Sequence, residues 1–389
     1  MRREKTLNFV AVVFFVVVFF VAFRLFRPSP FVLRATCRTR GHIAQVAFSP
    51  KGDILAATVV GPGIRADLWQ VPSGQLAQSF ALVTFAPGGI GFNPLAFSSD
   101  GRLLAVGYEE RGVNKICVFN VADGRRLKTV VMGKSSALPS VAFVPDGKLA
   151  VTHNGRLWFV RVESGEKIQT EIQAAQVTFS PNGLFIAAYS DLQDFVAIFD
   201  AKGQPVRRLE VKAAKASSRT SGLVVKATFS QDGQKFVCLW NDWKQVGRDF
   251  QMRRCVSVWR TKDWKLERSM PLTPFQTFTD GYGDISFDGS LVAVPKISLA
   301  GWDGLWWRLR RFFNTFSTRL FRSPIALPDP PLKVSVYRLE DGQLIAEWEG
   351  AYGAAFSLDG RYLAVSHGNE FWSVIVLREF RVSESDGAM

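Results

Sequence analysis

Six aspartates recur at similar places in this sequence and are its most regular candidates for acid–base chemistry. A carboxylate can transfer protons in a reaction when it is positioned beside the reacting group. Each of these residues falls in or beside a Gly-containing turn of a repeated hairpin: Asp53, Asp100, Asp146, Asp232, Asp288 and Asp359. Because Asp and Asn near Gly are typical of tight turns, the spacing favours a role in turns over a catalytic role.

Motifs for nucleophilic, metal-dependent or phosphate chemistry are absent from the sequence, which contains no GxSxG, HExxH or P-loop pattern. Three histidines, His42, His153 and His367, give little material for a metal site. We interpret His42 as a structural residue between repeats, and His153 and His367 as the ends of strands. The sequence therefore predicts no catalytic residue, no metal and no cofactor, and a protein that is not an enzyme.

The cysteines are too few and too scattered for a disulfide framework: Cys37, Cys117, Cys238 and Cys255, with no CxxC pair. Cys238 and Cys255 fall in neighbouring predicted strands, which allows a cross-strand disulfide. Buried free thiols are the favoured interpretation, because free Cys behaves as a small buried hydrophobe.

Residues 297–332 differ from the rest of the chain and contain the candidate membrane-contact residues. On a helix the apolar members fall on one side: Trp302, Leu305, Trp306, Leu309, Phe312, Phe313, Phe316 and Leu320. The arginines fall on the other side: Arg308, Arg311, Arg319 and Arg322. An interfacial membrane helix needs such a face. The alternative is a helix that packs on the protein's own surface, and we favour membrane contact.

The N-terminal segment predicts a transmembrane anchor. Residues 7–23 read LNFVAVVFFVVVFFVAF, without charge, Pro or Gly, and basic residues flank them on both sides. This length is at the short end of what spans a bilayer. A cleaved signal peptide is the alternative, but no A-x-A-like site follows, so a retained anchor within residues 1–30 is favoured.

The anchor predicts a single-pass membrane protein. Three basic residues precede the apolar segment and five follow it by residue 40, which favours a cytoplasmic body. The short basic N-terminal flank favours the opposite orientation. The side of the membrane on which the body lies therefore stays undetermined.

The formal charge of +14 is concentrated in two segments. Residues 1–40 carry +7 of it and residues 297–330 carry +3, which leaves +4 for the remaining body. A nearly neutral body offers no basic face, so no nucleic-acid partner is expected.

A repeated sequence motif organises the chain after residue 40. An apolar strand ending near Phe is followed by a polar turn with Gly and a second apolar strand, in seven copies that include residues 46–52, 95–101, 141–147, 177–183, 227–233, 285–289 and 355–360. A third strand follows each copy, and a second turn with a fourth strand follows six of them. Small four-stranded units cannot bury their faces alone, so they must stack in a ring.

These units resemble WD40-family propeller blades over roughly residues 32–380. The Gly-His signature occurs once, as Gly41-His42, with Trp69 at the matching end of a third strand. Gln70 and Arg260 replace the Asp that normally follows Trp in this family, so the repeats are divergent. The resemblance implies an all-β, seven-bladed β-propeller, here preceded by one transmembrane helix and carrying one amphipathic helical insertion in blade six.

The ends of the repeat region predict how the ring closes. The seventh repeat has three strands, whereas residues 31–37 form a strand-like run without a blade of its own. We expect residues 31–37 to pair with residues 371–379, so that residues 31–380 form one closed propeller. Residues 381–389 are expected to be a disordered tail.

The sequence favours a membrane-tethered, non-enzymatic scaffold that binds a protein or peptide partner. Partners are expected on a loop-built face or in the central channel, near residues 60–66, 108–114 and 212–222. Membrane lipid is the second expected partner, through the anchor and the insertion. The alternative is a propeller enzyme or small-molecule binder with its site at the channel mouth, which would need acids, bases or metal ligands clustered there.

Overall fold

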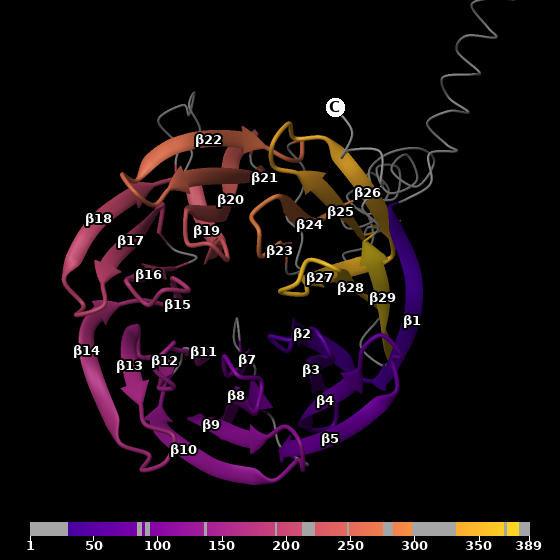
Figure 1. The fold of residues 1–389 in the computed structure, drawn as a ribbon, viewed down its shortest axis with the longest axis vertical. Coiled ribbons are helices and arrows are strands. Elements are labelled where there is room, and N and C mark those ends of the chain that lie inside the picture. Colours follow the sequence, from indigo (N-terminus) through magenta and orange to yellow (C-terminus); the bar gives the residue numbers. More distant parts are fainter. Residues whose placement is uncertain are drawn as a thin grey trace, which may run out of the picture.

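The computed structural model describes residues 30–83, 88–89, 94–135, 138–190, 193–211, 222–246, 249–274, 283–297, 332–368 and 372–380. These residues form seven antiparallel sheets arranged around a common axis (Figure 1). Each sheet is one blade, and within the blade its first strand lies nearest the axis (Figure 1). The protein is therefore a seven-bladed β-propeller, as the repeats predict.

The first three blades follow the chain in order. Blade 1 contains β2 (His42–Phe48), β3 (Ile54–Val60), β4 (Ile64–Gln70) and β5 (Leu76–Val83). Blade 2 contains β7 (Leu95–Phe97), β8 (Leu103–Glu110), β9 (Val113–Asn120) and β10 (Arg126–Lys134), and the short β6 (Gly88–Gly89) also pairs with β8. Blade 3 contains β11 (Ser140–Phe143), β12 (Leu149–His153), β13 (Arg156–Val160) and β14 (Lys167–Gln173).

The remaining blades continue the pattern. Blade 4 contains β15 (Gln176–Phe179), β16 (Phe185–Tyr189), β17 (Phe195–Asp200) and β18 (Pro205–Glu210). Blade 5 contains β19 (Gly222–Phe229), β20 (Lys235–Val246), β21 (Asp249–Arg260) and β22 (Lys265–Pro271). Blade 6 contains β23 (Asp284–Ile285), β24 (Leu291–Ile297), β25 (Leu332–Arg338) and β26 (Leu344–Glu349). Blade 7 contains β27 (Ala351–Phe356), β28 (Tyr362–Gly368), β29 (Trp372–Phe380) and β1 (Phe31–Arg40).

The strand β1 closes the ring. It pairs antiparallel with β29, from Phe31 opposite Phe380 to Arg40 opposite Trp372, and supplies the fourth strand of the last blade. This pairing is the closure expected from the sequence, and it extends three residues further than the predicted run. The buried Asp67 of blade 1 accepts hydrogen bonds from Thr39 of β1 (2.6 Å) and Ser79 (2.6 Å). The closing strand is thus paired within blade 7 and hydrogen-bonded to blade 1.

The hydrophobic core lies in the seams between blades. Seven clusters of buried side chains are present, and each combines residues of two adjacent blades. The cluster between blades 4 and 5, for example, joins Tyr189 and Ile198 to Phe236 and Trp240. Burial therefore depends on neighbouring blades, which is why the units are stable only as a ring.

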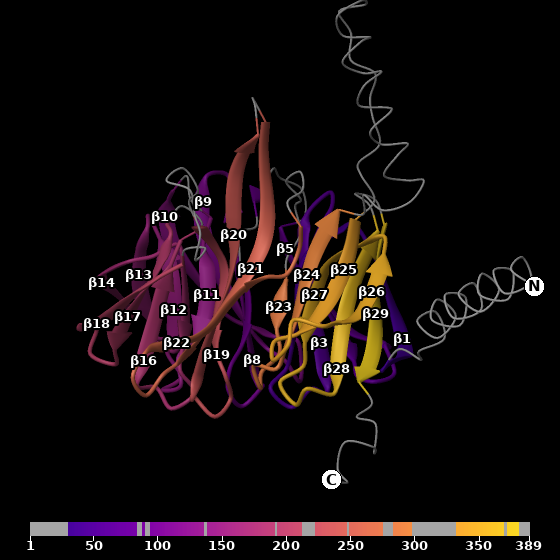
Figure 2. The same cartoon turned by 90° about the horizontal axis from the view of Figure 1, so that it is seen from above.

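The two faces of the ring differ in their connections. We call the turn face the one that carries the links from first to second and from third to fourth strands, and the variable face the opposite one. First-to-second links are five residues long in every blade, and third-to-fourth links are four to six. Links on the variable face range from one residue to the 34 residues between β24 and β25. The longest hairpin, β20–β21, projects from the variable face (Figure 2).

Three expectations about loops need correction. The links expected at residues 60–66 and 108–114 are shorter, because β3, β4, β8 and β9 extend into them and leave only residues 61–63 and 111–112. Residue 222, at the end of the third expected loop (212–222), belongs to β19, where Gly222 pairs with Asp242. In each case backbone hydrogen bonds to the neighbouring strand extend the sheet beyond what the local sequence indicates.

The predicted anchor (residues 7–23), the tail (residues 381–389) and the core of the insertion (residues 298–331) lie outside the described residues. Residues 297 and 332, at the limits of the predicted insertion, belong to β24 and β25 and pair with each other. Within the described part of the chain, no helix has the length and apolar character needed to cross a bilayer.

Candidate functional site

The repeated aspartates have a structural role in the turn face. In the first-to-second turns, a buried serine hydroxyl donates to the carboxylate, as between Ser98 and Asp100 (2.6 Å) or Ser230 and Asp232 (2.6 Å). The same carboxylate oxygen accepts the backbone N–H two residues further on. These hydrogen bonds, first from the serine and then from the backbone, lower the pKa of Asp100 and Asp232. The carboxylates are therefore fixed as ionised acceptors that hold the turns.

One ion pair links three blades at the innermost strands. Asp284, at the start of β23, accepts from Lys226 Nζ of β19 at 2.6 Å, and its other oxygen accepts from the backbone N–H of Phe356 at 2.8 Å. Asp284 is 9 % exposed. Both carboxylate oxygens are thus engaged in contacts between blades 5, 6 and 7, and the arrangement stabilises the seams.

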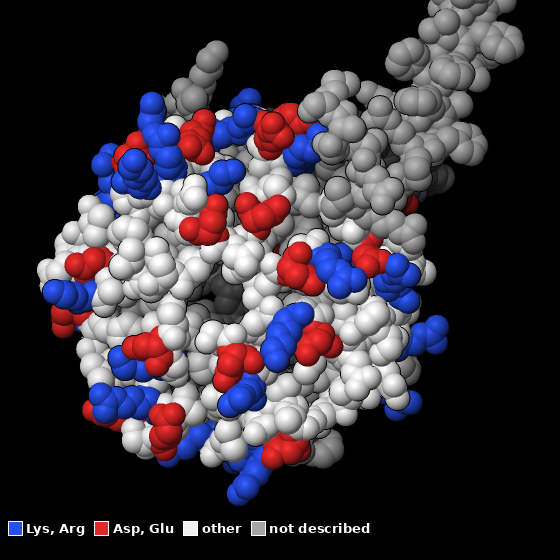
Figure 3. All heavy atoms as spheres, in the orientation of Figure 1, with Lys and Arg blue, Asp and Glu red and all other residues white. Residues whose placement is uncertain are grey.

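The centre of the turn face is open. Figure 3 looks onto this face and shows a hole at the axis with mostly uncharged surface around it. Acidic and basic side chains alternate further out (Figure 3). Among the described residues, no group of three or more His, Cys, Asp or Glu side chains could hold a metal ion.

The three histidines lie in different blades. His42 stacks on Tyr352 across the seam between blades 1 and 7, with ring centroids 5.2 Å apart. His153 contacts the amides of Asn114 (3.3 Å) and Asn154 (3.1 Å), and burial, followed by Lys167, lowers its pKa. Burial also lowers the pKa of His367, at the end of β28 in blade 7. The structure does not bring these histidines together, and the first contact agrees with the structural interpretation of His42.

All four cysteines are buried free thiols. Cys238 lies opposite Ser257 and Cys255 lies opposite Trp240, so the two cysteines occupy different rungs of β20 and β21. The favoured interpretation is confirmed and the cross-strand disulfide is not formed. Burial raises the pKa of Cys37 and Cys255 to about 12, so these thiols are protonated at neutral pH.

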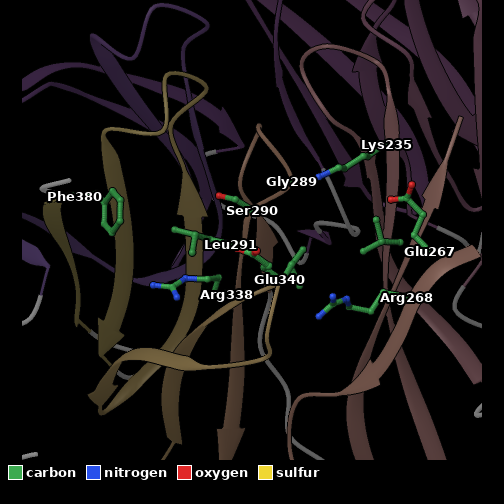
Figure 4. A pocket seen from close by; sticks show the side chains of 11 residues that line it. Lys235, Glu267, Arg268, Gly289, Ser290, Leu291, Arg338, Glu340 and Phe380 are labelled. Carbon is green, nitrogen blue, oxygen red and sulfur yellow. The ribbon is translucent and has the colours of Figure 1, made fainter. Parts of the chain in front are cut away.

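A cavity of about 670 Å³ lies on the turn face between blades 5 and 6. Figure 4 shows Lys235, Glu267 and Arg268 on the blade 5 side and Ser290, Arg338 and Glu340 on the blade 6 side. Phe380, the last residue of β29, also lines it. The cavity carries both signs of charge and no metal-ligating cluster. Sequence reasoning did not find it, because its walls combine strand and turn residues of three blades that no motif distinguishes from those of the other blades.

The candidate membrane-contact residues of the insertion all lie outside the described residues: Trp302, Leu305, Trp306, Arg308, Leu309, Arg311, Phe312, Phe313, Phe316, Arg319, Leu320 and Arg322. The stem from which they leave is described. Lys296 and Lys333 flank it and contact Glu347 of β26 at 2.6 and 3.1 Å. Burial opposes ionisation of Glu347, but the hydrogen bonds from Lys296 and Ser335 keep its pKa below the ordinary value. The predicted insertion therefore begins and ends beside one rung, Lys296 opposite Lys333, whose two lysines are ion-paired with Glu347.

Comparison with known proteins supports the fold. The solved structures that match include the β-propeller domain of Cps50 (Swd1) from Myceliophteria thermophila, at 14% identity and a TM-score of 0.58, covering 91% of this chain and 100% of that one. They also include Kuenenia stuttgartiensis hydrazine synthase, at 15% identity and a TM-score of 0.60, covering 87% and 95%. No family model and no curated protein matches the sequence. At these identities the likeness shows the propeller fold alone.

Proposed function

We propose that this protein is a membrane-tethered β-propeller that acts as a non-enzymatic scaffold for protein–protein interactions. The observation that carries the proposal is the difference in link length between the two faces. Every first-to-second link on the turn face has five residues, whereas links on the variable face range from one residue to 34. Insertions on one face leave the seams intact, so that face can be adapted to a protein partner.

The projecting hairpin gives the variable face its most prominent described feature. β20 and β21 are each 12 residues long and pair along their full length, up to Val246 opposite Asp249. At its base Arg253 binds the buried Asp242 at 2.8 Å. This ion pair supports the ribbon where it leaves the sheet, and a supported ribbon presents a fixed surface to a partner.

The charged groups near the axis support a scaffold over an enzyme. Hydrolysis or lyase chemistry at a channel mouth requires acids, bases or metal ligands that are available to a substrate. On the described inner strands, one carboxylate oxygen of Asp284 binds Lys226 and the other accepts the backbone N–H of Phe356. The turn aspartates are committed to serine hydroxyls and backbone N–H groups.

The tether rests on the sequence of residues 7–23, which is uncharged, apolar except for Asn8, and flanked by basic residues. A chain held by such a helix would keep the propeller close to the bilayer. Lipid contact by the insertion is the second part of this proposal, because an aromatic face opposite arginines suits the membrane interface.

The experiment is affinity purification of the full chain from detergent-solubilised membranes, compared with a variant in which residues 244–251 are replaced by a two-residue Asn-Gly turn. We expect a specific partner to co-purify with the full chain and to be lost or reduced with the shortened hairpin. A chain with Ser73→Ala on the turn face is the control and should retain the partner. Equal recovery of the partner with both variants would show that the hairpin is not part of the interface. Failure to find any specific partner would contradict the scaffold function.

A further inference from the structure

Two described positions mark where the candidate membrane segments join the ring. Phe31 begins β1 in blade 7, and the rung of Ile297 and Leu332 ends β24 and begins β25 in blade 6. Blades 6 and 7 are neighbours, so both segments leave from the same sector (Figure 1). They leave from opposite faces, because β1 starts opposite Phe380 on the turn face and the insertion joins a second to a third strand.

Phe31 is fixed in the fold. It is 4 % exposed, and its ring contacts Trp348 edge-on at 5.4 Å and Phe380 at 5.0 Å. Residues 24–30, which include Pro28 and Pro30, connect Phe31 to the predicted anchor. Seven residues reach at most about 25 Å. The start of β1 must therefore lie within about that distance of the end of the anchor.

The rim of this sector has the composition of an interfacial surface. β1 exposes Arg34, Arg38 and Arg40 and carries no carboxylate itself, although Arg34 is ion-paired with Glu379 of the adjacent β29. Leu33, next to Arg34, is 56 % exposed. On the neighbouring β26, Leu344 is 47 % exposed, and the half-buried Trp348 lies under the guanidinium of Arg378 at 4.7 Å. The carboxylates of this strand, Glu347 and Glu349, are both ion-paired with Lys333. Arg38 and Arg40 beside the exposed Leu33 and Leu344 suit anionic lipid head groups and the interfacial region beneath them.

The two attachment points constrain how the ring can stand. β1 has ten residues, which at about 3.3 Å each separate the faces by about 30 Å. A ring lying with its turn face on the bilayer would hold the insertion stem that far from lipid. A ring standing on its rim places both attachment points near the same surface.

We propose that the rim formed by β1 and β26 binds the surface of a membrane rich in anionic lipid, so that the propeller stands edge-on and leaves both faces accessible. This inference rests on the membrane tether of the proposed function and adds the surface, the orientation and the class of lipid.

The experiment places a fluorophore on an introduced cysteine of the full chain, reconstituted in vesicles of phosphatidylcholine and phosphatidylserine with a trace of lipid that bears a nitroxide quencher on its head group. The native thiols are buried, so labelling is selective. Leu33→Cys reports the proposed rim. Val131→Cys, also exposed, reports β10 of blade 2, a distant part of the rim (Figure 1).

Strand β10 is a matched control, because it carries Arg126, Lys128 and Lys134 and no carboxylate, as β1 carries three arginines. We expect quenching at Leu33→Cys to exceed that at Val131→Cys by at least about threefold. Arg38→Glu should then halve the quenching at Leu33→Cys, whereas Lys134→Glu should leave it unchanged.

Equal quenching at the two positions, or stronger quenching at Val131→Cys, would overturn the edge-on orientation while the tether stands. Equal effects of the two charge reversals would overturn a specific role for β1. Release of the full chain from vesicles by alkaline carbonate would instead contradict the tether, and the orientation with it.

Discussion

The turn face and the variable face are built from the same strands but follow different rules. On the turn face, five of the seven first-to-second links have the same hydrogen bond, from a serine to an aspartate two positions later, or to Asn182 in blade 4. On the variable face, link lengths differ by more than an order of magnitude. The turn face therefore preserves the blades, and the variable face is where sequence change costs least stability.

Among substitutions on the turn face, that of Trp264 is expected to change the free energy of unfolding most. It occupies a third-to-fourth turn of blade 5 with a positive φ of 56°, a backbone conformation in which other blades use Gly, and its ring packs on Phe185 at 5.2 Å and Phe236 at 6.1 Å. Trp264→Ala should lower the free energy of unfolding by about 3–5 kcal/mol, because a buried aromatic ring is lost. Guanidinium denaturation measures this, and Lys265→Ala at the exposed neighbouring position should stay within about 0.5 kcal/mol.

Ser230 tests the repeated hydrogen bonds. Its hydroxyl donates to Asp232 and accepts the N–H of Lys235 at 2.9 Å, in a site that is 1 % exposed. Ser230→Ala should cost about 1–2 kcal/mol, since both partners lose a hydrogen bond. Ser73→Ala, in an exposed turn, is the control for denaturation curves. A cost as small as that of the control would show that the repeated serines are dispensable.

The turn aspartates predict an acid-dependent loss of stability. A lowered pKa in the folded state contributes stability above the ordinary value of about 4, and this contribution disappears as the pH falls through the folded pKa. Replacing Asp100 and Asp232 together by Asn should change stability at pH 7 by less than about 1 kcal/mol, because Asn182 already fills this position in blade 4 with a 2.7 Å bond from Ser180.

The same double variant should lose less stability than the natural chain between pH 5 and pH 2, because two titrating carboxylates are gone. Thermal melting across that range measures the effect. If the melting temperature of the variant depends on pH in the same way as that of the natural chain, the role given to these carboxylates is wrong.

The smallest effect on stability is expected from the insertion on the variable face. Deleting residues 302–322 should change the free energy of unfolding by no more than about 0.5 kcal/mol, because the stem pairs Ile297 with Leu332 without it. Vesicle binding should respond strongly. A chain that lacks residues 1–30 should bind anionic vesicles in flotation assays and should lose this binding with the deletion. Unchanged binding would reject membrane contact by the insertion.

Some features of the ring could be predicted from short-range patterns. Asp-Gly turns and alternating apolar residues specify hairpins locally, so the seven repeats and the strand at residues 31–37 were identifiable, and β1 pairs with β29 as expected. Strand lengths were less predictable, because residues 60 and 64–66 were assigned to a loop but lie in β3 and β4. Val60 and Ile64 favour strands by residue type, but the pairing of β3 with β4 fixes how far the strands extend, and the Gly-Pro-Gly turn beside them had suggested a longer loop.

The contacts at the candidate sites, in contrast, could not be predicted from short-range patterns. The pairing of Lys226 with Asp284 joins residues 58 positions apart in blades 5 and 6, and nothing in either local sequence indicates it. The cavity beside Arg268 and Arg338 likewise depends on where two turns end in space.

The sequence alone determined the number of blades and the closing strand, because hairpins and their periodic apolar residues are encoded within a few positions of each other. The tertiary structure decided which side chains share a seam, which face carries variable links, and that β1 and the insertion stem occupy one sector at opposite faces. Those relations depend on the angle and stagger between sheets packed around an axis, and residues distant in the chain set them jointly.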